Sequence, residues 1–185
     1  MDNAPQIYDA AVIGGGPAGL IAAIALASTG VRTALLARRV PYADNRTTAL
    51  LGASVDLLER LDVWPRCREQ AAALRTMRLV DDTGRLIRAP EVRFSSDEIG
   101  LEQFGFNIDN RSLMVALEAR AAELSNLTRF DDEAATIDPQ DSIVAVATGK
   151  GEHLAARLVI GADGRQSPSR QAAGIEVSRR DLHQS

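Results

Sequence analysis

Apolar and polar positions alternate in short blocks over the first forty residues, and this pattern predicts a strand, a helix and a second strand. Ile7–Ile13 is short, β-branched and mostly apolar, which is typical of a buried parallel strand. Leu20–Ser28 contains small and apolar helix formers, and Gly30 follows where the helix is expected to stop. Val31–Ala37 is then the next strand. The three elements predict a βαβ unit with a right-handed crossover.

The middle of the chain is less regular. Arg38–Thr48 is polar and predicts a loop, and the leucine spacing in Ala49–Leu61 predicts a helix. Leu74–Asp81 and Arg85–Ala89 predict a hairpin, because the Asp-Thr-Gly between them is typical of a turn. Val92–Phe94 is expected to extend that small sheet.

The last third predicts a return to the first sheet. Phe104–Ile108 is expected to be a short strand and Arg111–Leu124 a helix, with Leu127–Phe130 as a further parallel strand. Three more apolar runs predict an antiparallel β-meander: Ala134–Ile137, Ser142–Thr148 and His153–Ile160. Gly174–Val177 is read as the start of another strand. The fold class is therefore α/β, with a parallel sheet and an antiparallel meander.

Composition narrows the class of protein. The 185 residues suggest about one domain, and 45% hydrophobic with 25% charged residues is ordinary for a globular chain. The net charge of −4 gives no support to nucleic-acid binding. A single cysteine, Cys67, suits a reducing compartment, and glycines interrupt the apolar run 10–27, so we expect a cytoplasmic protein without a membrane span. No His or Cys spacing predicts a metal site.

The segment Gly14–Gly19 fits the pattern G-x-G-x-x-G between a predicted strand and a predicted helix. Gly14 permits the tight turn, Gly16 lets the backbone approach a pyrophosphate, and Gly19 allows close packing of helix on strand. The start of the helix offers N–H groups to the phosphates. The candidate contacts are Gly14, Gly16, Pro17, Ala18 and Gly19.

The ribose of such a dinucleotide would be expected to meet an acidic residue at the end of the second strand. That end contains Ala37, Arg38 and Arg39, and no carboxylate occurs before Asp44. An arginine there could meet the 2′-phosphate of NADP or pack on an adenine ring. These spacings alone leave the identity of the dinucleotide open.

A second motif lies at Arg157–Arg170, where an apolar strand enters a glycine-acid turn. Asp163 stands at the end of the strand and is placed to accept a hydrogen bond from a hydroxyl group. Gly164 leaves the backbone beside it open. Ser167 is a good N-cap for a helix that starts at Pro168.

The two motifs together resemble the FAD-dependent aromatic hydroxylases, the group that contains p-hydroxybenzoate hydroxylase. Asn45–Leu50 also resembles that group, in particular its ubiquinone-biosynthesis hydroxylases. The resemblance covers essentially the whole chain, as an amino-terminal portion of such an enzyme. It implies a Rossmann-like FAD/NAD(P)-binding domain and the beginning of a substrate-domain sheet.

The resemblance also implies roles for single residues. The glycine loop would hold the FAD diphosphate, and Asp163 with Gly164 would contact the riboflavin end and the pyrophosphate. Arg46 would lie close to the flavin, and Asn110 or Arg111 would make a further contact. Arg38 is the nearest substitute for the family's acidic residue, which is Ala37 here. A downstream Gly-Asp motif of the family is absent, so we expect an incomplete flavin pocket and weak FAD binding by this chain alone.

The implied activity is hydroxylation of an aromatic ring, phenolic or quinone-precursor, with NAD(P)H as reductant and O₂. Residues 1–73 and 104–174 would form the FAD-binding domain, and residues 74–103 and 175–185 a truncated part of the substrate domain. A membrane surface and other biosynthetic enzymes stay open as partners, as does the oligomeric state. Two alternatives stay open: an NADP-binding oxidoreductase of another class, and a non-catalytic dinucleotide-binding fragment.

Overall fold

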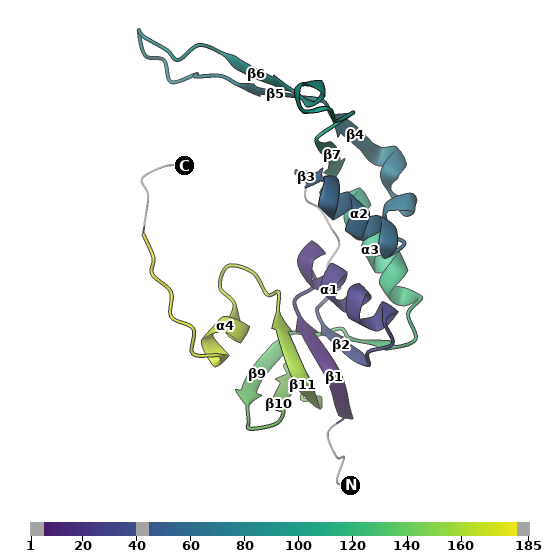
Figure 1. Ribbon diagram of the computed structural model, residues 1–185. Coiled ribbons are helices and arrows are strands. Elements are labelled where there is room, and N and C mark those ends of the chain that lie inside the picture. The colour runs from purple at the N-terminus through teal and green to yellow at the C-terminus, as the bar shows by residue number, and fades with distance from the viewer. Residues whose placement is uncertain (1–5, 40–44, 181–185) are drawn as a thin grey trace. The chain divides into compact units, whose positions relative to one another are not determined.

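The structure is a computed structural model that describes residues 6–39 and 45–180 (Figure 1). Its contacts divide the chain into two compact units. The first unit combines Met1–Pro41 with Leu117–Ser185, and the second is Tyr42–Ala116. Asp44, the first carboxylate after the second strand, lies outside the described residues.

A six-stranded mixed sheet forms the first unit, in the order β8-β2-β1-β11-β10-β9. Strands β8, β2, β1 and β11 run parallel to one another. Strands β10 and β9 continue the sheet, and each pairs antiparallel with its neighbour. The strands are β1 (Gln6–Ile13), β2 (Thr33–Leu36), β8 (Leu127–Phe130), β9 (Ala134–Pro139), β10 (Val144–Thr148) and β11 (His153–Gly161). This confirms the predicted α/β class, the returning parallel strand and the meander.

Helix α1 (Pro17–Ser28) connects β1 to β2 and contacts both strands (Figure 1). Proline at the first helical position fits because the missing N–H has no partner inside a helix there. The helix ends where the Thr29 hydroxyl donates to the Leu26 carbonyl at 2.8 Å and Gly30 turns the chain with φ +87°. The sequence between these ends is apolar nearly all round, so α1 is suited to burial.

An apolar core covers the face of the sheet to which the side chains of Tyr8, Ala11 and Ile13 belong. Residues of β2, β10 and β11 complete this meander-side core, and Phe130 packs against it with its ring nearly perpendicular to that of Tyr8. The remaining buried members are Ala34, Leu36, Val146, Leu154 and Ala156. Neighbouring positions on β1 and β2 are buried as well, so the centre of the sheet is covered on both faces.

Two small antiparallel sheets and short helices make up the second unit. One sheet has the order β3-β7-β4 and the other pairs β5 with β6. The strands are β3 (Thr47–Leu51), β4 (Ala71–Leu74), β5 (Thr76–Leu79), β6 (Val92–Ser95) and β7 (Gly105–Asp109). The helices are α2 (Gly52–Arg60), η1 (Trp64–Arg66), η2 (Arg68–Gln70), η3 (Ser96–Ile99) and α3 (Asn110–Ala122), which crosses the boundary between the units.

The predicted helix over Ala49–Leu61 is wrong in its first three residues. Thr47–Leu51 is strand β3, and the helix begins only at Gly52. Strand β3 pairs with β7 over five residues. At Gly105 a Cβ would lie 2.0 Å from the Leu50 carbonyl oxygen, so the two backbones meet where only glycine fits. This long-range pairing overrides the local helical pattern.

The predicted hairpin has the wrong second strand. Thr76–Leu79 pairs with Val92–Ser95, while Arg85–Ala89 lies in the loop between them. The Asp81 carboxylate closes this loop by accepting the Thr83 N–H at 3.1 Å and the Ala89 N–H at 3.0 Å. Pro90 then interrupts the segment just before β6 starts, because proline has no N–H for a strand ladder.

The expected strand at Gly174–Val177 is also absent from the described part of the chain. The short helix α4 (Pro168–Ala172) ends there, and Gly174 follows with φ +67°. Residues 175–180 have no regular secondary structure. Ile175 and Val177, which Glu176 separates, have no neighbouring strand here with which to pair.

The meander-side core predicts a strong dependence on single buried side chains. Leu36→Ala removes a side chain that is 1% exposed and should lower the free energy of unfolding by about 2–5 kcal/mol. Leu158→Ala, at a position 52% exposed, should change it by at most about 0.5 kcal/mol. Urea unfolding followed by circular dichroism measures both, and equal effects would contradict this assignment of the core.

Candidate functional site

The glycine loop lies where three parallel strands end. The Gly14 N–H donates to the Leu36 carbonyl of β2 at 3.0 Å, and the Ala162 N–H after β11 donates to the Ile13 carbonyl of β1 at 2.7 Å. Gly14 has φ +117°, and a Cβ at this position would lie 2.2 Å from the Ala162 carbonyl oxygen. The turn therefore requires glycine at position 14 for both conformation and space.

The other two glycines of the motif differ in their surroundings. A Cβ at Gly19 would lie 1.9 Å from the Gly14 carbonyl oxygen, so glycine lets the first turn of α1 lie against the loop. A Cβ at Gly16 would meet nothing within 4 Å. The backbone at Gly16 is thus open to an approaching group, and the N–H groups of the first helical turn lack partners inside the helix.

The second motif follows β11 directly. Asp163 Oδ2 accepts the Ser169 N–H at 2.8 Å, and Ser167 Oγ accepts the Arg170 N–H at 3.0 Å, so both side chains cap α4. Asp163 Oδ1 is buried and has no hydrogen-bond partner among the described residues. Gly164 turns the chain with φ +82°. One oxygen of this carboxylate therefore caps α4. The other is buried close to the Ser169 hydroxyl, which also has no partner among the described residues.

Two opposing effects act on the pKa of Asp163. Burial raises the pKa, while hydrogen bonds from Ser167 and Ser169 lower it further than burial raises it. The net result is a pKa below the usual value for aspartate. The carboxyl is an anion at neutral pH, which makes it a strong acceptor for a hydroxyl donor.

The structure brings the two motifs together. A Cβ at Gly14 would lie 2.8 Å from the Asp163 nitrogen. Candidate residues from positions 14–19 and 163–164 therefore lie together at the carboxyl ends of β1 and β11, within a single unit. Ligands of parallel α/β sheets bind at this edge.

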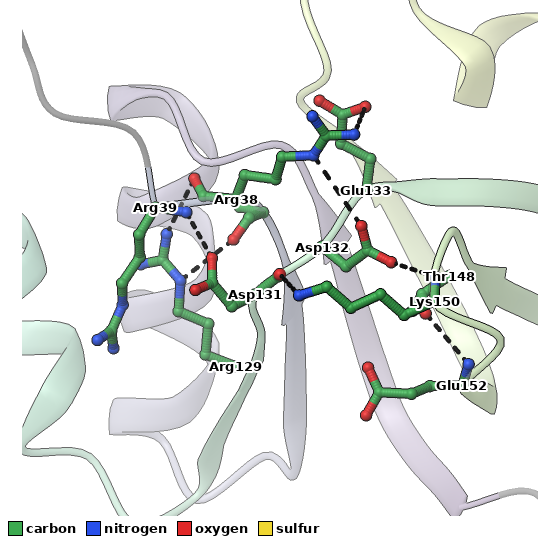
Figure 2. Close-up of polar contacts among 10 residues, drawn as sticks. Arg38, Arg39, Arg129, Asp131, Asp132, Glu133, Thr148, Lys150 and Glu152 are labelled. Carbon is green, nitrogen blue, oxygen red and sulfur yellow. Dashed lines mark hydrogen bonds and ion pairs between the residues drawn. The ribbon is translucent and has the colours of Figure 1, made fainter.

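Arg38 lies at the end of β2 and is held by acidic residues from the turn after β8 (Figure 2). Its guanidinium is 3.1 Å from a Glu133 oxygen and 4.0 Å from an Asp132 oxygen, with the Arg38 side chain 58% exposed. Such an exposed pair is weak, but it directs the guanidinium toward Glu133. Ala37 is buried, and a Cβ at Gly15 would lie 2.6 Å from the Ala37 Cβ.

Sequence reasoning missed the part of β8 that borders the same strand end. Arg129 Nε donates to the Ala37 carbonyl at 3.3 Å, and its guanidinium forms an ion pair with Glu118 of α3. Asp131 Oδ1 accepts the Arg39 N–H at 2.6 Å, as Figure 2 shows. The signal for them in the sequence is their position at the carboxyl end of 127–130, a predicted parallel strand that the structure pairs with β2.

The remaining candidates lie in the second unit. The Asn110 N–H donates to the Arg46 carbonyl at 3.0 Å, and the Thr48 hydroxyl donates to the Asn110 side-chain oxygen. Asn110 is buried, whereas Arg111 is exposed. Arg46 and Asn110 are therefore neighbours at the adjoining ends of β3 and β7. Asp109 caps α3 by accepting the Ser112 N–H at 2.8 Å.

Cys67, possible metal ligands and possible membrane-crossing helices were the other features to compare with the described residues. Cys67 is buried, and burial and nearby Asp109 raise its thiol pKa. No group of three potential metal ligands occurs in residues 6–39 and 45–180. Over the same ranges, no helix combines the length and the apolar character needed to cross a bilayer.

The six-stranded sheet and the two motifs at its edge are those of a dinucleotide-binding domain. The chain belongs to the FAD binding domain family, whose model matches residues 7–183. This agrees with the resemblance drawn from the two motifs and with FAD as the cofactor.

Named relatives narrow this class. The chain is 31% identical over 185 residues to the 3-demethoxyubiquinol 3-hydroxylase of Escherichia coli, covering 96% of this chain and 46% of that protein. It is 29% identical over 182 residues to the ubiquinone hydroxylase UbiL of Rhodospirillum rubrum, covering 95% and 41%. The chain thus spans less than half the length of these curated relatives.

A solved structure supports the fold. The p-nitrophenol 4-monooxygenase PnpA from Pseudomonas putida superposes with a TM-score of 0.75 at 20% identity, covering 92% of this chain and 44% of that one. At this identity the likeness concerns the fold alone.

The lowered pKa of Asp163 predicts an acid-dependent loss of stability. A carboxyl whose pKa is lower in the folded state stabilises the fold above its unfolded pKa, about 3.9 for aspartate, and loses this contribution as the pH falls through the folded value. Asp163→Asn should therefore be less stable than wild type at neutral pH, and the difference should shrink below about pH 4. Urea midpoints at both pH values measure this, and a constant difference would refute it.

Proposed function

We propose that this chain is the FAD-binding part of a flavoprotein monooxygenase that hydroxylates an aromatic ring. One observation carries the proposal: the glycine loop and the Asp163 turn meet at the carboxyl ends of β1 and β11. The open backbone at Gly16 and the unpartnered Asp163 Oδ1 are features that a bound dinucleotide would use. FAD, when bound, supplies the redox chemistry, and the protein supplies binding and orientation.

In the first unit, different residues would contact different parts of FAD. The pyrophosphate would lie at the start of α1, against the backbone of Gly16 and the first turn formed by Pro17, Ala18 and Gly19. The helix dipole favours a negative charge at that place. Asp163 Oδ1 would accept a hydrogen bond from a cofactor hydroxyl, and the backbone at Gly164 would lie next to the pyrophosphate. Gly14 acts by shaping the turn.

The adenosine end would border Ala37 and Arg38. Because the Arg38 guanidinium is engaged by Glu133, it offers its aliphatic stem and its planar face rather than an unpaired charge. Because this exposed ion pair is weak, the proposal of FAD rather than a dinucleotide with a 2′-phosphate rests on the match to the FAD binding domain family. We propose that Arg46, together with Asn110 or Arg111, contacts the flavin side of the cofactor. The hydrogen bond from the Asn110 N–H to the Arg46 carbonyl fixes these two residues relative to each other.

The reaction is proposed from the relatives. Two of them are named for hydroxylation of ubiquinol or ubiquinone, which supports a phenolic or quinone-precursor ring as substrate and NAD(P)H with O₂ as co-substrates. We also propose a functional division, with 1–73 and 104–174 serving FAD and 74–103 and 175–185 belonging to the substrate side. The single cysteine of the chain supports a reducing compartment, and we propose the cytoplasm.

A titration separates this proposal from the two alternatives. We expect weak binding of FAD by this chain alone, so the titration uses excess FAD, which should still quench the fluorescence of Trp64, while NADP at the same concentrations should give no change. Binding of NADP without FAD would favour an oxidoreductase of another class. Equal binding of FAD and NADP would favour a non-catalytic dinucleotide-binding fragment.

Gly16 is the sharpest test of the phosphate site. Gly16→Val places a side chain where the pyrophosphate would lie, and its Cβ meets no protein atom within 4 Å. FAD affinity should fall at least about tenfold, equivalent to 1.4 kcal/mol, with the circular dichroism spectrum unchanged. Gly52→Val is the matched control, because a Cβ at Gly52 also meets nothing within 4 Å. Equal affinity of the two variants would remove this loop from the site.

Asp163 tests the second motif. A charge-assisted hydrogen bond to a cofactor hydroxyl is worth about 1.5–3 kcal/mol, so Asp163→Ala should weaken FAD binding roughly 10- to 150-fold. Loss of the cap on α4 should also lower stability by about 1 kcal/mol. Ser167→Ala is the control that loses only a cap of the same helix. Lost stability with unchanged FAD affinity in Asp163→Ala would assign this residue a structural role alone.

A further inference from the structure

The loop between β5 and β6 carries the two most exposed large apolar side chains of the described residues. Leu86 is 102% exposed and Ile87 is 86% exposed. Both belong to residues 84–88, which we call the hairpin tip. Adjacent apolar side chains in water at a loop end have an unfavourable contact with solvent that a partner surface would remove.

The hairpin tip is held in place by hydrogen bonds. The Asp81 carboxylate binds the N–H groups of Thr83 and Ala89, on either side of the tip. Within the tip, Arg88 Nε donates to the Arg85 carbonyl at 3.3 Å. The loop therefore presents Leu86 and Ile87 from a closed turn, so little ordering is required when they are buried.

Arginines flank the two apolar residues. Arg85 precedes them and Arg88 follows them, and Arg88 reaches Asp82 at 3.9 Å in a solvent-exposed pair. The segment 74–95 has a net charge of +2, in a chain whose net charge is −4. Its charged residues are Arg75, Arg78, Asp81, Asp82, Arg85, Arg88, Glu91 and Arg93. This concentration of positive charge complements an anionic surface.

The tip lies outside the paired part of the hairpin. The cross-strand pairs Met77–Phe94 and Leu79–Val92 put their exposed apolar side chains on one face of the two-stranded sheet. Residues 84–88 lie beyond these paired positions.

We propose that the hairpin tip binds the surface of an anionic lipid bilayer. Leu86 and Ile87 enter the boundary between head groups and acyl chains, while Arg85 and Arg88 contact phosphate and carboxylate groups of the lipids. Apolar residues flanked by cations are the pattern that an interfacial anchor requires. This inference rests on the second unit alone and is independent of FAD binding.

Vesicle co-sedimentation of the 185-residue chain tests it. We expect binding to vesicles of phosphatidylcholine with phosphatidylserine, weaker binding to phosphatidylcholine alone, and a decrease as salt is raised. Leu86→Asp with Ile87→Asp should reduce the partition coefficient at least about tenfold. Arg85→Gln with Arg88→Gln should reduce it about fivefold per arginine on the anionic vesicles and little on the neutral ones.

Ile99→Asp is the matched control, since Ile99 is 65% exposed in the same unit but lies outside the tip. It should bind vesicles as wild type does. A second readout uses Ile87→Cys labelled with an environment-sensitive dye, which is selective because Cys67 is buried. The dye emission should shift to the blue on addition of anionic vesicles.

Three results would overturn the proposal. One is absence of wild-type binding to the anionic vesicles, and another is equal binding by the tip variants and Ile99→Asp. The third is a wild-type dimer in gel filtration that becomes monomeric in the tip variants without any vesicle binding, which would make the tip a contact between copies of the chain. Because none of these measurements includes FAD, their failure leaves the proposed function untouched.

Discussion

The first unit depends on one hydrogen bond between strand ends, donated by the Ala162 N–H to the Ile13 carbonyl at 2.7 Å. It closes the parallel pairing of β11 with β1 at the point where both chains leave the sheet. Gly14 can approach Ala162 only because it lacks a Cβ, and Gly19 can approach Gly14 for the same reason. The position of the helix start, of the open backbone at Gly16 and of the Asp163 carboxylate all follow from this contact.

Local signals made the first unit largely predictable. The βαβ start, the returning strand at 127–130 and the meander were each marked by apolar runs with glycine or polar breaks, and the structure contains all of them. The structure confirms that the tight turn at Gly14 and the close approach at Gly19 leave no room for a Cβ. The N-cap role of Ser167 was predicted from the Ser-Pro helix start and is confirmed. The cap that Asp163 adds by accepting the Ser169 N–H was not predicted.

Interactions between distant segments were not predictable in the same way. Strand β3 forms because β7 pairs with it, and the partner of β5 is Val92–Ser95 rather than the nearer Arg85–Ala89. The ion pair of Arg38 with Glu133 and the contact of Arg129 with Ala37 join residues more than 90 positions apart. No periodicity in a single sequence encodes such pairs, because they arise from which strand ends share an edge.

The β1–β11 pairing also has a consequence for biosynthesis. Strand β1 pairs with β2 soon after both are made, but its other neighbour, β11, begins some 150 residues later in the chain. At about 5–20 residues per second, a ribosome needs roughly 7–30 s to supply it. During that interval one edge of an apolar strand and the glycine loop beside it have no partner, which is the kind of nascent surface that chaperones bind. The dinucleotide loop, although encoded first, acquires its final shape last.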